Sequence, residues 1–485
     1  ATMNAGVSRF VPSEDLFQQV AADGVKNTIT LFEDSRRNLW VGSSGNGLYL
    51  LEKKDKQLVQ KLKPSDSKGV LQVRSIVEWI PGELLASDEG LTSYNIVTGK
   101  GETLRSDYRQ TNGLNDNYLQ TLFVDHEQAL WVGTYFGGVN YIPPTGNSFI
   151  HYYRGNTQLD ARIISVFAQA DQDNLWLGTD DAGFFYWDRK KNTFKSYKPQ
   201  HSVSGPTYHN IHALLQDGDK LYIGMYMGGL DIMDLKTGKF KNYKFGSSSR
   251  SLYASGIYAL YKDSAQRLWV GTTNGLNKYI PETDDFERIY EVHPADVSYI
   301  MEDKKGYLWV CSLNQGIFRL DGKTQKWEHF SLRTGEEENQ SVIPSNKIIT
   351  ACLDEKENLW FGTDGCGLLK YNYEEQVFEK VVLPETIRVV HKIIAANNEL
   401  WLTTSNGMYC YQPENGSIKI YNKLDGLQEN QFLPNSGIQL ADGTIFVGGI
   451  NGFNEFHPDR LASPNQKTTV VLADFQLFNK PVKVG

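Results

Sequence analysis

The stretch NLWVGSSGNG at Asn38–Gly47 decides the fold of this chain because it recurs along the sequence. Each copy has an apolar run around a large side chain, then a small residue, then a turn that contains glycine. The other strong copies are LWVGTYFGG (Leu130–Gly138), LWLGTDDAG (Leu175–Gly183), LYIGMYMGG (Leu221–Gly229), LWVGTTNG (Leu268–Gly275), LWVCSLNQG (Leu308–Gly316), LWFGTDGCG (Leu359–Gly367) and LWLTTSNG (Leu400–Gly407). Weaker copies are LLASDEG (Leu84–Gly90) and IFVGGING (Ile445–Gly452). A period of about 45 residues indicates a repeat architecture.

The repeat from Leu119 to Tyr153 shows what one unit contains. Its four apolar or alternating runs are Leu119–Val124, Leu130–Thr134, Val139–Ile142 and Ser148–Tyr153, with turn-like residues between them. Four short strands separated by turns predict one four-stranded antiparallel sheet. Such sheets set around an axis form a β-propeller, so we expect an all-β fold with about ten blades. A β-solenoid is the alternative, although its rungs are usually shorter than about 45 residues.

Three residue types recur at fixed places in the repeat, and each has a structural interpretation. We expect the tryptophan to pack between neighbouring sheets, the glycine to allow close approach of two blades or a bulge, and an aspartate to cap the turn before the tryptophan. The tryptophans are Trp40, Trp131, Trp176, Trp269, Trp309, Trp360 and Trp401. The glycines are Gly42, Gly133, Gly178, Gly224, Gly271 and Gly362, and the aspartates are Asp34, Asp125, Asp263, Asp303 and Asp354.

The whole pattern resembles the two-component regulator propeller repeat, and the resemblance covers nearly the entire chain. The segment Gly448–Leu461 (GGINGFNEFHPDRL), followed by Val470–Val482 (VVLADFQLFNKPV), is similar to the exit of that family from its last blade. The family builds the periplasmic sensor region of hybrid two-component systems in Bacteroidetes. The resemblance implies two tandem seven-bladed propellers, a following immunoglobulin-like sandwich, a homodimer, an oligosaccharide ligand and a histidine kinase outside this chain.

Counting seven repeats back from the last one suggests three domains. Residues 150–462 are expected to form a seven-bladed propeller, and residues 1–149 the last blades of a preceding one, with repeats at 40, 85 and 131. Residues 463–485 are expected to begin the sandwich. A single ten-bladed ring is the alternative, and the sequence does not decide between the two arrangements.

Composition narrows the functional class. The formal net charge of −8 argues against a nucleic-acid partner, which would require a basic stripe. No run approaches 18 consecutive apolar residues, so any contact with a membrane is expected only through segments outside this chain. No signal peptide is visible at Ala1–Phe10, which suggests either that one was removed or that the chain is a fragment. The four cysteines lack C-x-x-C spacing, and no metal or cofactor is expected.

The expected binding face lies where the turn after the tryptophan strand meets the connection into the next innermost strand. Large or charged side chains replace small ones there. The candidate ligand-binding residues are Tyr135, Phe136, Arg162, Asp180, Asp181, His209, Asn210, Tyr226, Asn346 and Arg388. Aromatic rings beside arginine, asparagine and aspartate suit a sugar, whose C–H faces stack and whose hydroxyl groups need hydrogen-bond partners. The alternative is that these residues only fill and solvate the funnel.

No catalytic motif supports an enzyme. The chain has no G-x-S-x-G, H-E-x-x-H or P-loop motif, and Asp180 and Asp181 are adjacent rather than set as an acid–base pair. We therefore expect a non-enzymatic sensor. A propeller lyase or glycosidase is one alternative, which turnover of a glycan would reveal. A protein-binding scaffold is another, which a large exposed apolar patch without a concave polar pocket would favour.

Overall fold

The computed structural model describes residues 6–21, 27–52, 57–62, 72–107, 113–142, 149–199, 205–332, 343–461, 476–477 and 480–481. The chain forms two compact units, residues 1–146 with 462–485 (unit 1) and residues 147–461 (unit 2). Among the described residues the only helices are three single-turn 3₁₀ segments, and no helix there has the length and apolar character needed to cross a bilayer. The all-β class built from four-stranded antiparallel sheets is thus confirmed.

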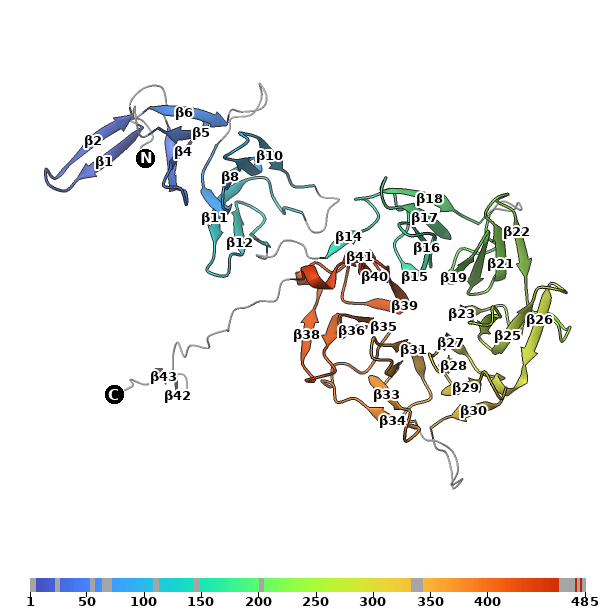
Figure 1. Ribbon diagram of the computed structural model, residues 1–485. Coiled ribbons are helices and arrows are strands. Elements are labelled where there is room, and N and C mark those ends of the chain that lie inside the picture. Colours follow the sequence, from blue (N-terminus) through green and yellow to red (C-terminus); the bar gives the residue numbers. More distant parts are fainter. Residues whose placement is uncertain are drawn as a thin grey trace. The chain divides into compact units, whose positions relative to one another are not determined.

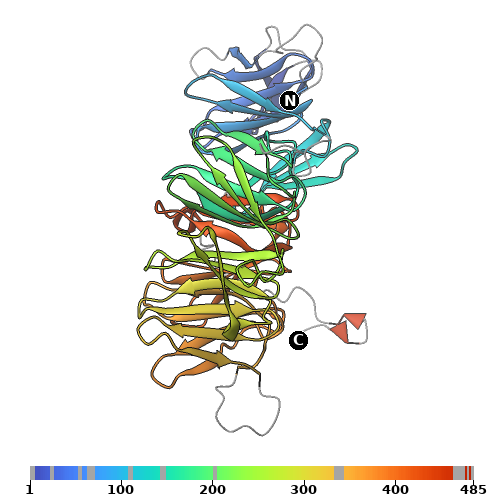
Figure 2. The same ribbon diagram turned by 90° about the vertical axis from the view of Figure 1, so that its right-hand side faces the viewer.

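Unit 2 is a ring of seven four-stranded antiparallel sheets in the part of it that the structure describes (Figure 1). The first strand of each sheet lies nearest the axis and the fourth lies at the rim, and Figure 2 shows the ring from its side. The first sheet consists of β15 (Ile164–Gln169), β16 (Leu175–Thr179), β17 (Phe184–Asp188) and β18 (Thr193–Tyr197). The second sheet consists of β19 (Ile211–Asp217), β20 (Lys220–Met225), β21 (Gly229–Asp234) and β22 (Phe240–Tyr243). The next two are β23 (Ile257–Lys262), β24 (Leu268–Thr272), β25 (Gly275–Ile280), β26 (Asp285–Ile289), and β27 (Val297–Glu302), β28 (Tyr307–Ser312), β29 (Ile317–Asp321), β30 (Trp327–Phe330). Then follow β31 (Ile348–Leu353), β32 (Leu359–Thr363), β33 (Leu368–Asn372), β34 (Val377–Lys380), and β35 (Lys392–Ala396), β36 (Glu399–Thr403), β37 (Met408–Tyr411), β38 (Ile418–Tyr421).

The last sheet of the ring takes its strands from both ends of unit 2. It consists of β39 (Phe432–Gln439), β40 (Ile445–Gly449), β41 (Gly452–Phe456) and, at the rim, β14 (Ile150–Tyr152). Strand β14 pairs antiparallel with β41, with Tyr152 opposite Phe453. The expectation that residues 148–153 supply the fourth strand of the preceding repeat is therefore wrong, because that strand closes this ring instead. A ring of ten blades is excluded for the same reason, since the β14–β41 pairing closes the ring around seven sheets.

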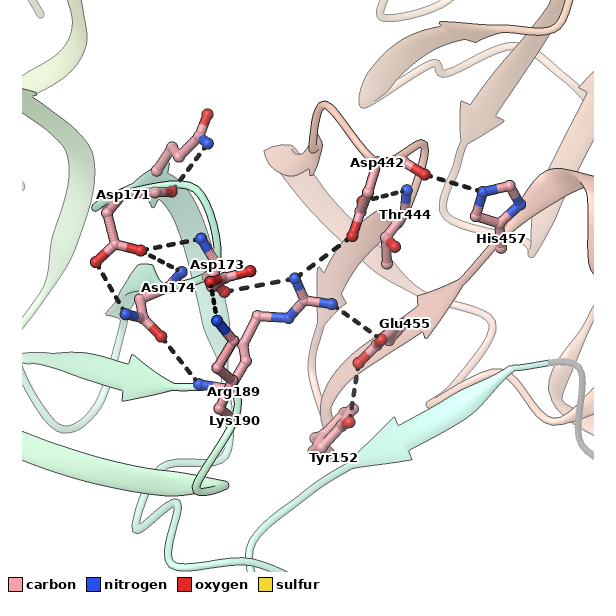
Figure 3. A network of polar contacts seen from close by, with 11 residues as sticks. Tyr152, Asp171, Asp173, Asn174, Arg189, Lys190, Asp442, Thr444, Glu455 and His457 are labelled. Atoms are coloured by element: carbon pink, nitrogen blue, oxygen red, sulfur yellow. Dashed lines mark hydrogen bonds and ion pairs between the residues drawn. The ribbon is translucent and has the colours of Figure 1, made fainter.

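Polar contacts reinforce this closure between the first and last sheets (Figure 3). The Tyr152 hydroxyl donates to Glu455 Oε2 at 2.8 Å, and Arg189 Nη2 donates to Glu455 Oε1 at 3.3 Å. The Arg189 guanidinium also lies 3.9 Å from the Asp442 carboxylate and over the Phe446 ring. The two ends of unit 2 are thus joined by side chains as well as by a strand pair.

One asparagine connects the innermost strands of several blades across the centre of the ring. Asn435 in β39 has a positive φ of 58°, and its backbone N–H donates to the His391 carbonyl at 2.9 Å. Its side-chain Nδ2 donates to the carbonyls of Ser298 at 3.0 Å and Ile349 at 3.1 Å. The innermost strand of the last sheet is therefore tied to β27, to β31 and to the residue preceding β35.

The recurring tryptophan and glycine pack neighbouring sheets of unit 2 together, as predicted. Trp269 is buried with Val297 and Ile300 of the next sheet. A Cβ atom on Gly271 would lie only 2.5 Å from Val297 Cγ1, so a side chain there would clash with the next blade. Packing between neighbouring sheets thus explains why a large residue recurs at the tryptophan position and a small one at the glycine position.

The recurring aspartate does more than cap its turn. Asp34 Oδ1 accepts from the backbone N–H groups of Arg36 and Asn38, and Oδ2 accepts from Trp40 Nε1. Burial raises the pKa of Asp34, but the hydrogen bonds from Trp40, Asn38 and Arg36 outweigh that effect and lower the pKa overall. The same tryptophan-to-aspartate bond, at 2.7 to 2.9 Å, joins Trp131 to Asp125, Trp269 to Asp263, Trp309 to Asp303 and Trp360 to Asp354.

Unit 1 contains a two-stranded hairpin, two four-stranded sheets and a three-stranded sheet among its described residues. The hairpin is β1 (Val7–Val11) with β2 (Leu16–Ala21). The four-stranded sheets are β3 (Thr28–Glu33), β4 (Leu39–Ser43), β5 (Gly47–Leu51), β6 (Leu58–Leu62), and β7 (Ile76–Ile80), β8 (Glu83–Asp88), β9 (Gly90–Asn95), β10 (Gly101–Leu104). The three-stranded sheet is β11 (Leu119–Val124), β12 (Leu130–Thr134), β13 (Val139–Ile142). Of the predicted sandwich start at 463–485, only the short pair β42 (Gln476–Leu477) and β43 (Lys480–Pro481) is described, and the rest lies outside the described residues.

The three-stranded sheet of unit 1 has an uncovered face. Trp131 is 41% exposed there, with the exposed rings of Phe123 and Tyr141 opposite it on the neighbouring strands. Trp40, at the same place in the first four-stranded sheet, is 1% exposed. The prediction that every tryptophan of this set packs between two sheets is wrong for Trp131, because no described sheet of unit 1 covers it.

Candidate ligand-binding site at the mouth of the seven-bladed ring

The mouth of the ring is the end of its central channel where the turns after the second strands lie beside the starts of the innermost strands. Backbone hydrogen bonds form it in the same way in several blades. The residue that starts the turn after the second strand donates its N–H to the carbonyl of the residue just before the innermost strand of the same sheet. Thus Asp180 N–H donates to the Ile163 carbonyl at 3.2 Å, Tyr226 N–H to Asn210 at 3.1 Å, and Leu313 N–H to Asp296 at 2.9 Å. These bonds hold the turn residues beside the starts of the innermost strands.

The second residue of each innermost strand decides how the mouth is filled. In β15 and β27 this residue is a serine, and the hydroxyls of Ser165 and Ser298 donate to carbonyls of neighbouring innermost strands. In β19 and β23 it is His212 and Tyr258, whose ring centroids lie 4.5 Å apart. Two adjacent blades therefore present rings at the mouth where others present small hydroxyl groups.

Tyr226 and Asp180 complete a cluster around these two rings. The Tyr226 ring centroid lies 6.1 Å from that of His212 and 6.3 Å from that of Tyr258. Asp180 Oδ1 lies 3.9 Å from His212 Nε2, which is beyond hydrogen-bond distance. We call Asp180, His212, Tyr226 and Tyr258 the mouth cluster.

Burial controls the charges of the mouth cluster. Burial, reinforced by the neighbouring Asp181 charge, raises the pKa of Asp180 to about 6, although His209 opposes the shift. Burial also lowers the pKa of His212 to about 4 and raises that of Tyr258 to about 12. At neutral pH Asp180 is therefore ionised while His212 and Tyr258 are neutral, so the contact between Asp180 and His212 is not an ion pair.

Several acceptor atoms at this mouth lack a donor. Asp180 Oδ1, Asn210 Oδ1 and Asp296 Oδ1 are buried and have no hydrogen-bond partner within the described part of the chain. Burial raises the pKa of Asp296 as well. Buried acceptors are nearly always paired in folded proteins, so a group of unpaired ones marks a place where water or hydroxyl groups of a ligand would bind.

Comparison with known proteins identifies the repeat. A family model described as the two component regulator propeller matches residues 254–274, which include β23 and Trp269. The chain carries a two component regulator propeller repeat. Histidine kinase P4 of Formosa agariphila is 25% identical over 474 residues, covering 94% of this chain but 34% of that protein. The chain thus spans about a third of the curated relative that it matches.

Solved structures share the fold of this chain. The extracellular domain of a hybrid two component system from B. thetaiotaomicron aligns with a TM-score of 0.69 and 19% identity, over 94% of this chain and 59% of that one. A second such domain from the same organism has a TM-score of 0.54 and 19% identity, over 99% of this chain and 65% of that one. The predicted resemblance to the sensor region of a hybrid two-component system is confirmed.

Six of the predicted site residues belong to the mouth cluster or lie close to its members in the sequence. Asp180, Asn210 and Tyr226 carry the contacts described above. Asp181 has a structural contact, because its Oδ2 accepts from the backbone N–H of Arg162 at 3.0 Å, while the Arg162 side chain is exposed. His209 is exposed and its ring lies 4.4 Å from that of Tyr208.

The other four predicted residues lie elsewhere. Asn346 precedes β31, and its Oδ1 accepts from the Leu332 backbone N–H at 2.6 Å. Arg388 precedes β35 with an exposed side chain, and its carbonyl accepts from Gly365 and Gly367. Tyr135 and Phe136 belong to unit 1 and line a cavity there.

Sequence reasoning missed His212, Tyr258 and Asp296. His212 and Tyr258 occupy the second position of their innermost strands, and Asp296 stands directly before one. The signal that could have found His212 and Tyr258 is their shared place as the second residue of an innermost strand, where the pairing with the next strand has a bulge. Comparing that one position across the sheets of unit 2 would have set the histidine and the tyrosine apart from the serines of β15 and β27 and the aliphatic residues of β31, β35 and β39.

Proposed function

We propose that this chain is the extracytoplasmic, ligand-sensing part of a hybrid two-component system, and that it binds a glycan-derived oligosaccharide at the mouth cluster. The observation that carries the proposal is the combination of clustered rings and unpaired acceptors. His212, Tyr226 and Tyr258 offer ring faces, while Asp180 and Asp296 offer carboxylate oxygens. Sugars need both, because their C–H faces pack on rings and their hydroxyl groups donate hydrogen bonds.

The charge of the mouth favours a neutral sugar. Asp180, Asp181 and Asp296 all stand at this mouth, and a sulfate or carboxylate group on the ligand would be repelled by them. We therefore expect a neutral oligosaccharide to bind more tightly than its sulfated counterpart.

Signalling would follow from binding through parts of the longer protein. The matched relatives are a histidine kinase and extracellular domains of two component systems, and the chain covers only part of each. In this proposal the chain lies in the periplasm as a homodimer, has no catalytic role of its own, and passes the binding signal to a kinase across the membrane.

Unit 1 fits the end of a first propeller. Among the described residues its last sheet has three strands and leaves the Trp131 face uncovered, whereas unit 2 closes with a strand from the start of its own segment. We propose that preceding blades of the same propeller cover this face in the longer protein.

One observation supports an enzymatic alternative. Asp180 is a partly buried carboxyl group with a pKa of about 6, which is the property required of a general acid near neutral pH. The alternative is a propeller lyase or glycosidase that acts at this mouth.

A thermal-shift screen of the chain against defined oligosaccharides, neutral and sulfated, tests the proposal. A ligand at one hundred times its dissociation constant should add roughly 2.7 kcal/mol of apparent stability. We expect a selective shift without product, and we expect Tyr258→Ala to reduce it. Product formation that Asp180→Asn removes would establish the enzyme instead, and no shift with any fragment would contradict binding at the mouth.

A further inference from the structure

A cavity lies within unit 1, and its lining does not include Trp131 or its neighbours Phe123 and Tyr141. Its volume is about 370 Å³, and its lining includes Arg74, Glu89, Tyr118, Gln120, Tyr135 and Phe136. Tyr118, which directly precedes the first strand of the three-stranded sheet, and the turn after the second strand of that sheet supply the aromatic side. The segments around β7 and β8 supply the charged side.

Three exposed rings form the aromatic wall of this cavity. Tyr118 is 57% exposed, Tyr135 is 65% exposed and Phe136 is 77% exposed. The Phe136 ring centroid lies 4.6 Å from that of Tyr135 and 6.2 Å from that of Tyr118. Clustered exposed rings of this kind are uncommon on protein surfaces and mark sites of interaction.

A single carboxylate holds the wall in place. Asp116 Oδ1 accepts from the Tyr118 backbone N–H at 3.0 Å, and Oδ2 accepts from the Phe136 backbone N–H at 2.9 Å. The Tyr135 N–H donates to the Tyr118 carbonyl at 2.8 Å. The backbone that carries the three rings is therefore positioned before any ligand arrives, which reduces the entropic cost of binding.

The exposure of these rings is independent of the uncovered Trp131 face. Tyr135 and Phe136 occupy the same turn position as Tyr226 and Met227, which are also exposed although unit 2 is a closed ring. The turn itself presents both pairs at the mouth side of its sheet.

The opposite side of the cavity carries one cationic and one anionic side chain, Arg74 and Glu89. Arg74 Nη2 donates to Gln72 Oε1 at 2.6 Å, and neither Arg74 nor Glu89 forms an ion pair within the described residues. Both side chains are exposed. A guanidinium with N–H donors beyond this bond and a carboxylate can both bind hydroxyl groups of a neutral sugar, and their opposite charges leave this side of the cavity neutral.

We propose that this cavity is a second carbohydrate-binding site, which takes a neutral sugar unit stacked on the rings of Tyr135 and Phe136 with hydroxyl groups bonded to Arg74 and Glu89. The inference rests on the proposed function for the class of ligand, but it assigns a site in a different unit. A chain with two such sites would bind two parts of a long oligosaccharide or two separate molecules.

The test compares matched double variants of the whole chain by isothermal titration with cellotetraose, xylotetraose, mannotetraose and galactotetraose. Tyr135→Ala with Phe136→Ala removes the unit 1 rings, and Tyr226→Ala with Met227→Ala removes the side chains at the same turn position in unit 2. Phe17→Ala, which deletes an exposed ring of the β1–β2 hairpin, is the control. Circular dichroism checks that each variant is folded.

We expect the unit 1 pair to weaken binding of at least one tetrasaccharide by tenfold or more, or to remove one of two sites, while Phe17→Ala has no effect. Loss only with the unit 2 pair would overturn the second site and leave the proposed function standing. Loss only with the unit 1 pair would support the second site and contradict binding at the mouth cluster. Equal binding by all variants, or no binding of any tetrasaccharide, would overturn both.

Discussion

The Tyr152 hydroxyl donates a 2.8 Å hydrogen bond to Glu455 Oε2, joining residues that are 303 positions apart in the sequence. The Tyr152 ring also stacks on Phe453, with centroids 4.7 Å apart and planes 9° apart. Burial and the Glu455 carboxylate raise the pKa of Tyr152, so the hydroxyl keeps its proton. This pair holds the strand that closes the seven-bladed ring.

Replacing Tyr152 with phenylalanine should lower the free energy of unfolding of unit 2 by about 1–2 kcal/mol, because the stacking remains while a hydrogen bond to a charged acceptor is lost. Urea titration followed by circular dichroism measures the change. Tyr290→Phe, at an exposed hydroxyl of the same unit, is the control and should change little. Equal stability of Tyr152→Phe and the parent would show that the strand pairing alone closes the ring.

Trp40 and Trp131 hold the same position in two sheets of unit 1 and make the same bond to an aspartate, but only Trp40 is covered by a neighbouring sheet. Trp40→Ala should destabilise unit 1 by about 3–5 kcal/mol, as expected for a fully buried large side chain. Trp131→Ala should cost clearly less. Denaturant unfolding of unit 1 compares the two, and an equal cost would mean that the Trp131 face is covered in solution.

Asp180 should make the stability of unit 2 depend on pH. Its folded pKa of about 6 lies above the usual value of 3.8, so between about pH 4 and pH 6 the folded state holds a proton that the unfolded state has released. Its contribution to stability therefore falls as pH rises through that window. His212, with a lowered pKa of about 4, has the opposite effect over a similar range, so the parent protein alone does not isolate either group.

The variant Asp180→Asn removes one of these two contributions. Relative to the parent, its free energy of unfolding should increase by an amount on the order of 2 kcal/mol between pH 4 and pH 7. Thermal or urea unfolding at both pH values measures the difference. A gap between variant and parent that is the same at both pH values would contradict a raised pKa for Asp180.

Asn435 should contribute to the stability of the ring because its side chain donates hydrogen bonds to two carbonyls across the axis. Asn435→Gly keeps the positive φ but leaves the carbonyls of Ser298 and Ile349 without this donor, and should cost about 1–3 kcal/mol. Asn398→Gly is the matched control, since Asn398 also has a positive φ but an exposed side chain in a turn. Equal stability of the two variants would show that these hydrogen bonds contribute nothing.

Several residues of the candidate site could be predicted from the sequence, but which of them lie together in space could not. The turn positions of Asp180 and Tyr226 follow from the repeat, since the turn after the tryptophan strand is set by local spacing. His212, Tyr258 and Asp296 join them only because neighbouring blades converge at the mouth. Tyr135 and Phe136 have the same local pattern as Tyr226 and Met227, yet they belong to another unit and another cavity.

The sequence by itself determined the blade, because the tryptophan, glycine and aspartate act within one sheet or between adjacent sheets, and their spacing records those contacts. The tertiary structure decided which blades close into a ring and which strand closes it. Strand β14 follows the repeat that begins at Leu119 in sequence, but it pairs with β41 because an unpaired sheet edge leaves backbone N–H and carbonyl groups without partners. That choice depends on contacts between residues hundreds of positions apart, and no local pattern contains it.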